Sequence, residues 1–144
     1  MNSNYTIYCD GGARGNPGPA AYGFVIYDSK GSKVYEEGKA IGETTNNIAE
    51  YSGVIAALRY LHKHSIITNQ QSIINFFMDS KLVVEQLSER WKIKNENLRS
   101  LYFTIKELEQ KVGANFSYSS VPREQNRQAD RLVNLALDNQ SSKF

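Results

Sequence analysis

Four acidic residues occupy positions from which a carboxylate can do chemistry. Asp10 ends an apolar run and opens into a glycine-rich turn, and Asp79 ends a second apolar run. Glu50 and Asp130 each fall about one turn into a segment with helical periodicity. If the two apolar runs are parallel neighbouring strands, Asp10 and Asp79 project side by side at one sheet edge, and the two helical carboxylates lean over that edge. The sequence therefore predicts one cluster of four carboxylates.

A cluster of this kind indicates a bound cation. Four carboxylates with no Lys or His between them repel one another, so a divalent ion is needed to hold them together. Ligands that are all oxygen favour Mg²⁺ or Mn²⁺ over zinc. Two such ions about 3.5 to 4 Å apart are a common device for phosphodiester chemistry. The four glycines between residues 11 and 18 also bare backbone N–H groups that can approach a phosphate.

Each carboxylate taken singly has an ordinary structural explanation. Asp10 can start a hairpin turn, and Asp79 can cap a helix. Glu50 and Asp130 can be partners of a helix dipole. The case for catalysis therefore rests on the set of four.

The elements that must position these residues follow from turn signals and periodicity. Residues 4 to 42 read as two consecutive antiparallel hairpins, and Asn46 or Asn47 is expected to cap the first helix. After the first strand, further strands are expected at 20–27, 33–41, 72–78 and 114–121. Helices are expected at about 47–63, 81–89, 97–111 and 127–138. This order predicts an α/β protein with a mixed sheet and helices on both faces.

Composition narrows the class. The 144 residues are expected to form a single domain, with a core at about 4–138 and a short tail in which Phe144 docks on the surface. A net charge of +2 permits a polyanionic partner without requiring one. The single cysteine, Cys9, is expected to be a buried strand thiol in a reducing, cytoplasmic compartment. No segment has the length and apolarity of a membrane span or a leader peptide.

The four carboxylates stand within motifs that resemble those of type 1 ribonuclease H, in the family's order. The motifs are Asp10-Gly11-Gly12 with Gly15-Asn16-Pro17-Gly18, Thr44 to Tyr51, Met78 to Val83, and Val121 to Asn126 leading to Ala129-Asp130. The resemblance spans residues 5 to about 137. It is strongest to the short archaeal and bacterial branch, in which the fourth motif reads Pro-Arg-Glu.

The resemblance implies a fold and a reaction. The fold has five strands in the order 3-2-1-4-5, and the reaction is cleavage of the RNA strand of an RNA–DNA hybrid to 5′-phosphate and 3′-hydroxyl ends. With substrate bound, two Mg²⁺ or Mn²⁺ ions are expected. Asp10 would bridge both ions, Glu50 and Asp79 would complete one site, and Asp130 would hold the other, with Gly11 beside the metals.

The resemblance also implies substrate contacts. The matching positions are Gly12, Asn16, Asn46, Asn47, Ser80, Lys81, Trp91 and Asn126. The amides of Asn16, Asn46 and Asn47 can hydrogen-bond the 2′-hydroxyls that distinguish RNA from DNA. Turn and cap chemistry explains Asn46 and Asn47 equally well, and the two roles can coexist.

Three departures from the family pattern matter. The histidine that many relatives carry before the last helix is missing, and Arg123 is the candidate for its catalytic role, as a cation that cannot shuttle a proton. Lys81 stands where glutamine is common. The long basic protrusion that many relatives use to hold the DNA strand is absent. Trp91, which stands between basic residues, is either a substrate contact or a residue that fills the core. With few Lys and Arg contacts left, hybrid binding should depend strongly on salt. His62 and His64 are expected at the surface.

The predicted function is therefore a metal-dependent endoribonuclease acting as a monomer without an obligate protein partner. One alternative is a binding module for hybrid or double-stranded RNA in which catalysis has lapsed. Another is the nuclease domain of a retroelement polymerase, although Met1, five residues before the first strand, favours a complete gene. The sequence leaves open whether double-stranded RNA is cut.

Overall fold

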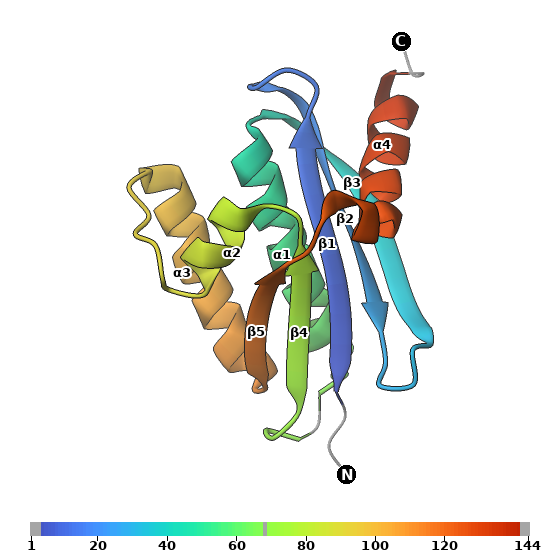
Figure 1. Ribbon diagram of the computed structural model, residues 1–144, viewed down its shortest axis with the longest axis vertical. Coiled ribbons are helices and arrows are strands. Elements are labelled where there is room, and N and C mark those ends of the chain that lie inside the picture. Colours follow the sequence, from blue (N-terminus) through green and yellow to red (C-terminus); the bar gives the residue numbers. More distant parts are fainter. Residues whose placement is uncertain (1–3, 68, 142–144) are drawn as a thin grey trace.

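One mixed sheet with strand order β3-β2-β1-β4-β5 organises the chain (Figure 1). The computed structural model describes residues 4–67 and 69–141. The strands in this part are β1 (Tyr5–Ala13), β2 (Gly18–Tyr27), β3 (Lys33–Thr44), β4 (Ile73–Met78) and β5 (Asn115–Ser120). β1, β2 and β3 pair antiparallel, whereas β4 lies parallel to both β1 and β5. The predicted fold class and strand order are confirmed.

Helices cover both faces of the sheet (Figure 1). They are α1 (Asn46–Lys63), α2 (Lys81–Leu87), α3 (Glu96–Val112) and α4 (Arg127–Ser141), with a 3₁₀ turn η1 (Arg123–Gln125) before α4. Side chains of α1, α2 and α3 form the larger core with one face of the sheet. α4 lies on the opposite face and shares a small separate core with Ala21 of β2.

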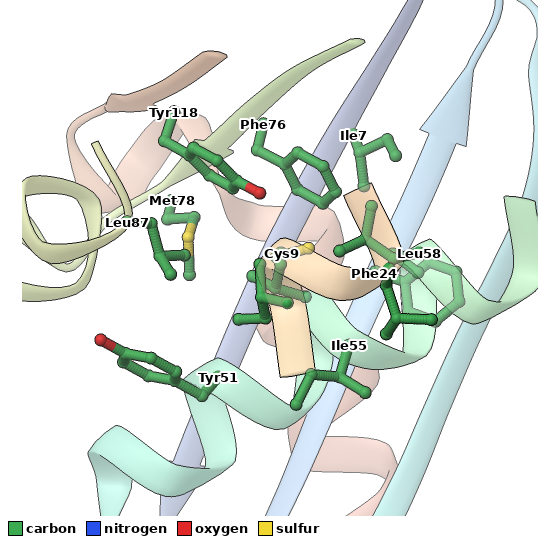
Figure 2. Packing of buried hydrophobic residues seen from close by; sticks show 14 of the residues in the cluster. Ile7, Cys9, Phe24, Tyr51, Ile55, Leu58, Phe76, Met78, Leu87 and Tyr118 are labelled. Carbon is green, nitrogen blue, oxygen red and sulfur yellow. The ribbon is translucent and has the colours of Figure 1, made fainter. Parts of the chain in front are cut away.

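Alternation along the strands decides which residues enter the larger core. Ile7 and Cys9 of β1 and Phe76 of β4 are completely buried against α1, which contributes Leu58 (Figure 2). Burying apolar area at about 25 cal/mol per Å² is the main stabilising term. The prediction that Cys9 is a buried thiol is confirmed. Because side chains alternate, Asp10, which follows Cys9, points to the α4 face.

Polar side chains cap α1, α2 and α3 at their N-terminal ends. Thr45, and not Asn46 or Asn47, caps α1 by accepting a hydrogen bond from the backbone of Ile48. The prediction was wrong by one position because Thr and Asn are both good caps, and only the backbone direction separates them. Asn95 caps α3, which ends at Gly113 with φ of 75°.

Other boundaries differ slightly from the predicted ones. β3 runs on to Thr44 and α4 to Ser141, while α2 stops at Leu87. The predicted docking of Phe144 falls outside the described residues. Within the described residues, no helix is both long enough and apolar enough to cross a lipid bilayer.

Candidate active site

Asp10 belongs to a row of residues that crosses three strands on the α4 face. It pairs with Gly23 of β2, which pairs in turn with Gly38 of β3. A Cβ atom at Gly23 would lie 2.6 Å from the carbonyl oxygen of Ala129, and one at Gly38 would lie 2.6 Å from that of Leu132. Because neither glycine has a side chain, α4 rests almost directly on the sheet. Asp130 in its first turn is thereby brought to Asp10.

Asp79 reaches the same point from β4. The parallel register aligns Tyr8 with Phe77, so that Asp10 and Asp79, two residues further on, leave neighbouring strands at one edge. Glu50 approaches this edge from α1 on the other side of the sheet. A cavity of about 640 Å³ contains all four carboxylates in its lining. The predicted juxtaposition of the four carboxylates is therefore present in the structure.

Glu50 is the fifth residue of α1 rather than a first-turn residue. An interaction with the helix dipole falls off within the first turn, so the alternative explanation for Glu50 loses its support. Asp130 does lie in the first turn of α4, so its position is compatible both with an interaction with the helix dipole and with a role in the carboxylate cluster.

Crowding and burial disfavour ionisation in this cluster. Asp10 and Glu50 are each only 8% exposed. Burial, followed by the charge of Asp79, raises the pKa of Asp10 to about 8. Burial, followed by the charge of Asp10, raises the pKa of Glu50 to about 8. The pKa of Asp79 is also raised, mainly by burial, although Asn126 and Arg123 oppose this shift. Without a cation, the cluster therefore retains protons at neutral pH.

The donor set fits a hard divalent cation. All four side chains offer only oxygen, and the raised pKa values of Asp10 and Glu50 indicate that the protein compensates their negative charge only in part. Among the described residues, no three His, Cys, Asp or Glu side chains are already arranged to hold an ion. Binding of Mg²⁺ or Mn²⁺ therefore requires these carboxylates to turn toward a common point.

Arg123 lies at the rim of the cavity. Its Nη2 atom is 3.6 Å from Oδ1 of Asp130, and its side chain is 79% exposed. The side chain is thus free to reach toward a phosphate without leaving the site. A catalytic role for Arg123 stays a prediction.

Two of the predicted RNA-contacting asparagines also connect the glycine-rich turn to α1. Oδ1 of Asn16 accepts a hydrogen bond from the backbone of Asn46 at 3.0 Å, and Oδ1 of Asn46 accepts one from the backbone of Ala13 at 2.7 Å. Asn46 and Asn47 line the cavity together with Gly11 and Gly12. These bonds give Asn46 a structural role, and its contact with RNA stays a prediction.

Ser80 and Asn126 both have roles within the protein. Ser80 caps α2 by accepting from the backbone of Val83, and an interaction with its side chain lowers the pKa of Glu50. Asn126 is only 1% exposed and bonds to the protein itself. The Asn126 side chain is not part of the cavity lining, and its predicted contact with substrate stays a prediction.

Trp91 and Lys81 form a second, separate feature on the surface. Trp91 is 45% exposed, so the alternative that it fills the core is wrong. Nζ of Lys81 lies 5.9 Å from the centre of the Trp91 ring, within range of a cation–π interaction. A contact of either residue with substrate stays a prediction. His62 and His64 are exposed, as expected.

The sequence reasoning missed the two glycines beneath α4. An isolated glycine inside a strand signals close approach of another backbone, and Gly23 and Gly38 both carried that signal. What the sequence could not show is that the two are paired in register.

Comparison with known proteins places this geometry in a family. A family model described as "Reverse transcriptase-like" matches residues 8–136. The chain is 40% identical over 131 residues to ribonuclease HI of Halobacterium salinarum, covering 91% of this chain and 63% of that protein. It superposes on LC11-RNase H1, solved in complex with RNA/DNA hybrid, with a TM-score of 0.88 and 40% identity over 94% of this chain and 98% of the other.

The chain belongs to the type 1 ribonuclease H family. It is also 47% identical over 133 residues to the bifunctional protein Rv2228c of Mycobacterium tuberculosis, covering 92% of this chain. The chain spans 35% of the length of that mycobacterial protein and 63% of the length of the halobacterial one.

Proposed function

We propose that this protein hydrolyses the RNA strand of RNA–DNA hybrids, as a single domain, and leaves 5′-phosphate and 3′-hydroxyl ends. The observation that carries the proposal is the gathering of Asp10, Glu50, Asp79 and Asp130 in one cavity. Two of these carboxylates are buried where ionisation is costly, and a bound dication would offset the cost of the ionised form. A module that only binds hybrid would gain nothing from such a cluster.

Asp10 would contact both metal ions, Glu50 and Asp79 would complete one site, and Asp130 would hold the second, close to the backbone of Gly11. When bound, Mg²⁺ or Mn²⁺ would supply activation of water and stabilisation of the leaving oxygen. The side chains would then be ionised, because a nearby dication lowers the pKa of a carboxyl group. Their part is to hold the ions and orient the scissile phosphate.

Recognition of RNA would rest on the amides beside the cavity. Asn16, Asn46 and Asn47 lie where the glycine-rich turn meets α1, and their amides suit 2′-hydroxyl groups. Gly12 adds no side chain to the adjacent wall of the cavity. A Cβ atom built at Gly12 would have no atom of a non-neighbouring residue closer than 3.9 Å. Recognition through 2′-hydroxyls and backbone predicts little preference for base sequence.

The test is cleavage of end-labelled substrates by the wild type and Asp10→Asn. RNA–DNA, RNA–RNA and DNA–DNA duplexes are incubated with Mg²⁺, Mn²⁺ or EDTA, and the products are mapped at nucleotide resolution. Asp138→Asn is the matched control, because Asp138 is an exposed α4 residue paired with Arg14.

We expect metal-dependent cuts in the RNA strand of the hybrid, which Asp10→Asn abolishes and Asp138→Asn leaves intact. The RNA–RNA lane decides whether double-stranded RNA is also a substrate. Wild-type protein that binds the hybrid and leaves it whole in both metals would favour a non-catalytic binding module. The same preparation must first be shown to be folded by circular dichroism.

A further inference from the structure

Asn126 joins three of the four carboxylate-bearing segments. Its Nδ2 atom donates to the carbonyl oxygen of Cys9, the residue before Asp10, at 2.8 Å. An interaction of its side-chain amide with the Asp79 carboxylate lowers the pKa of that group. Its backbone carbonyl oxygen accepts from the backbone N–H of Asp130 at 3.1 Å. One residue therefore connects the end of β1, the end of β4 and the first turn of α4.

The orientation of the Asn126 amide follows from its neighbours. A carbonyl and a carboxylate are both acceptors, so the NH₂ group must face them, and it has two hydrogens to offer. Oδ1 points the other way, is buried, and has no hydrogen-bond partner among the described residues. The residue is 1% exposed. An arrangement that leaves a buried acceptor unpaired is costly, so the bonds made by the NH₂ group must outweigh that loss.

We infer that Asn126 is a positioning residue that sets the separation and the orientation of Asp10, Asp79 and Asp130 for metal binding. The inference rests on the proposed function, because it concerns the same site. Asn126 acts without touching substrate or metal. Its side chain acts through the Cys9 carbonyl and the Asp79 carboxylate, while its backbone carbonyl accepts from the Asp130 amide, a bond that a change of side chain leaves in place.

The chemistry of the site explains why such a residue is needed. The carboxylates repel one another, and Asp79 at the end of β4 would otherwise turn away from Asp10 toward solvent. A buried neutral amide beside Asp79 favours one position of that side chain without adding a positive charge that would compete with the metal ion. Loss of a supporting polar contact of this kind typically costs about 10- to 100-fold in metal affinity or activity.

Two variants separate hydrogen bonding from packing. Asn126→Leu has nearly the shape of asparagine and keeps the space filled, but it has no donor. Asn126→Ala removes both donor and volume. Gln125→Ala is the matched control, because Gln125 is the exposed last residue of the 3₁₀ turn and directly precedes Asn126.

Two readouts are needed. Mg²⁺ binding to the substrate-free protein is measured by calorimetry, and kcat and KM are measured on a labelled RNA–DNA hybrid. We expect both Asn126 variants to bind Mg²⁺ about tenfold or more weakly and to lose kcat by a similar factor at fixed Mg²⁺. KM for the hybrid should change by less than about threefold, because a group that does not touch substrate contributes little to its binding. Gln125→Ala should match the wild type.

Other outcomes overturn the inference. A raised KM with unchanged kcat and Mg²⁺ affinity would make Asn126 a substrate contact. Wild-type Mg²⁺ affinity and kcat in Asn126→Leu would mean that only packing matters. If the variants do not fold, exchange of the Asn126 side-chain amide protons is followed by NMR in the wild type, and rapid exchange of both protons would exclude the hydrogen bond to Cys9 on which the inference rests. Calorimetry and NMR need no turnover, so they test the inference even if the hybrid is not cleaved.

Discussion

Gly11 of β1 lies directly against the peptide bond between Ala49 and Glu50 of α1. A Cβ atom built at Gly11 would overlap the backbone nitrogen of Glu50. β1 and α1 thus approach each other as closely as two backbones can, at the point where one carries Asp10 and the other carries Glu50. The distance between these two carboxylates depends on the absence of a side chain.

Gly11→Ala should therefore separate α1 from β1. Because the clash is with backbone atoms, no rotamer change relieves it, and we expect a loss of about 2 to 4 kcal/mol in unfolding free energy. Urea denaturation measures this loss. Gly12→Ala is the control for stability, since the nearest atoms to its Cβ would be 3.9 Å away, and it should cost less than about 1 kcal/mol. Equal costs for the two variants would contradict the close approach.

The pKa values of Asp10 and Glu50 predict how stability depends on pH in the absence of metal. Both pKa values are about 8 in the folded protein, against 3.8 and 4.5 as ordinary values. The contribution of these two groups to the unfolding free energy is fully present below pH 4, where they are protonated in both the folded and the unfolded protein. It is lost as pH rises toward 8, because over this range only the unfolded protein ionises them readily. In EDTA, the unfolding free energy should fall over this range by several kcal/mol relative to Asp10→Asn.

Mg²⁺ should reverse that loss. Since the ion binds ionised carboxylates, its stabilising effect should be larger at pH 8 than at pH 5. Thermal unfolding at both pH values, with and without Mg²⁺, measures the difference. Glu107→Gln, which changes an exposed residue paired with Lys111, should keep the wild-type pattern. An equal rise in Tm at both pH values would argue against a carboxylate site.

Arg123 should contribute to turnover through its charge. Arg123→Ala is expected to lower kcat about 10- to 100-fold, the equivalent of one charge-assisted hydrogen bond to a phosphate oxygen. Arg123→Lys should recover part of the loss, because it restores charge without the planar fork. Steady-state kinetics of these variants, with Arg131→Ala as an exposed α4 control, measures the effect. Full activity in Arg123→Ala would contradict a catalytic role for Arg123.

Trp91 and Lys81 should affect hybrid binding rather than chemistry. We expect Trp91→Ala to weaken hybrid binding about 5- to 100-fold, as for loss of one stacking contact worth about 1 to 3 kcal/mol, with little change in kcat. Fluorescence anisotropy with labelled hybrid in EDTA measures this without cleavage. Lys81→Ala should reduce the salt dependence of binding as well. Leu135→Ala, at another exposed apolar residue, should have no effect.

The sequence was sufficient for the fold because its signals were local and consistent. Apolar runs, turn residues and helical periodicity together indicated every strand and helix, and boundaries moved only by a few residues. The choice of Thr45 over Asn46 as cap could not be made, because it depends on which side chain faces the first helical amides. Asn46 instead reaches back to Ala13.

The site was predictable in its charges and less so in its supporting residues. The four carboxylates were recognisable from their places at strand ends and helix starts. Asn126 matched a position of substrate contact, and the motif does not reveal its hydrogen bond to Cys9, which is 117 residues away in sequence. Ser80 lies where a helix cap is expected, but the sequence does not show its interaction with Glu50. Contacts between distant segments decide such roles, and periodicity does not reveal them.

The paired glycines beneath α4 also bear on how this protein can vary. α4 rests on bare backbone at Gly23 and Gly38. The absence of side chains at these two positions therefore sets the distance between Asp130 and the sheet. The outward residues of α4 can therefore be exchanged freely without moving the carboxylate. The outward surface of α4 can therefore accept substitutions, whereas Gly23 and Gly38 beneath it cannot accept even the single carbon atom of an alanine side chain.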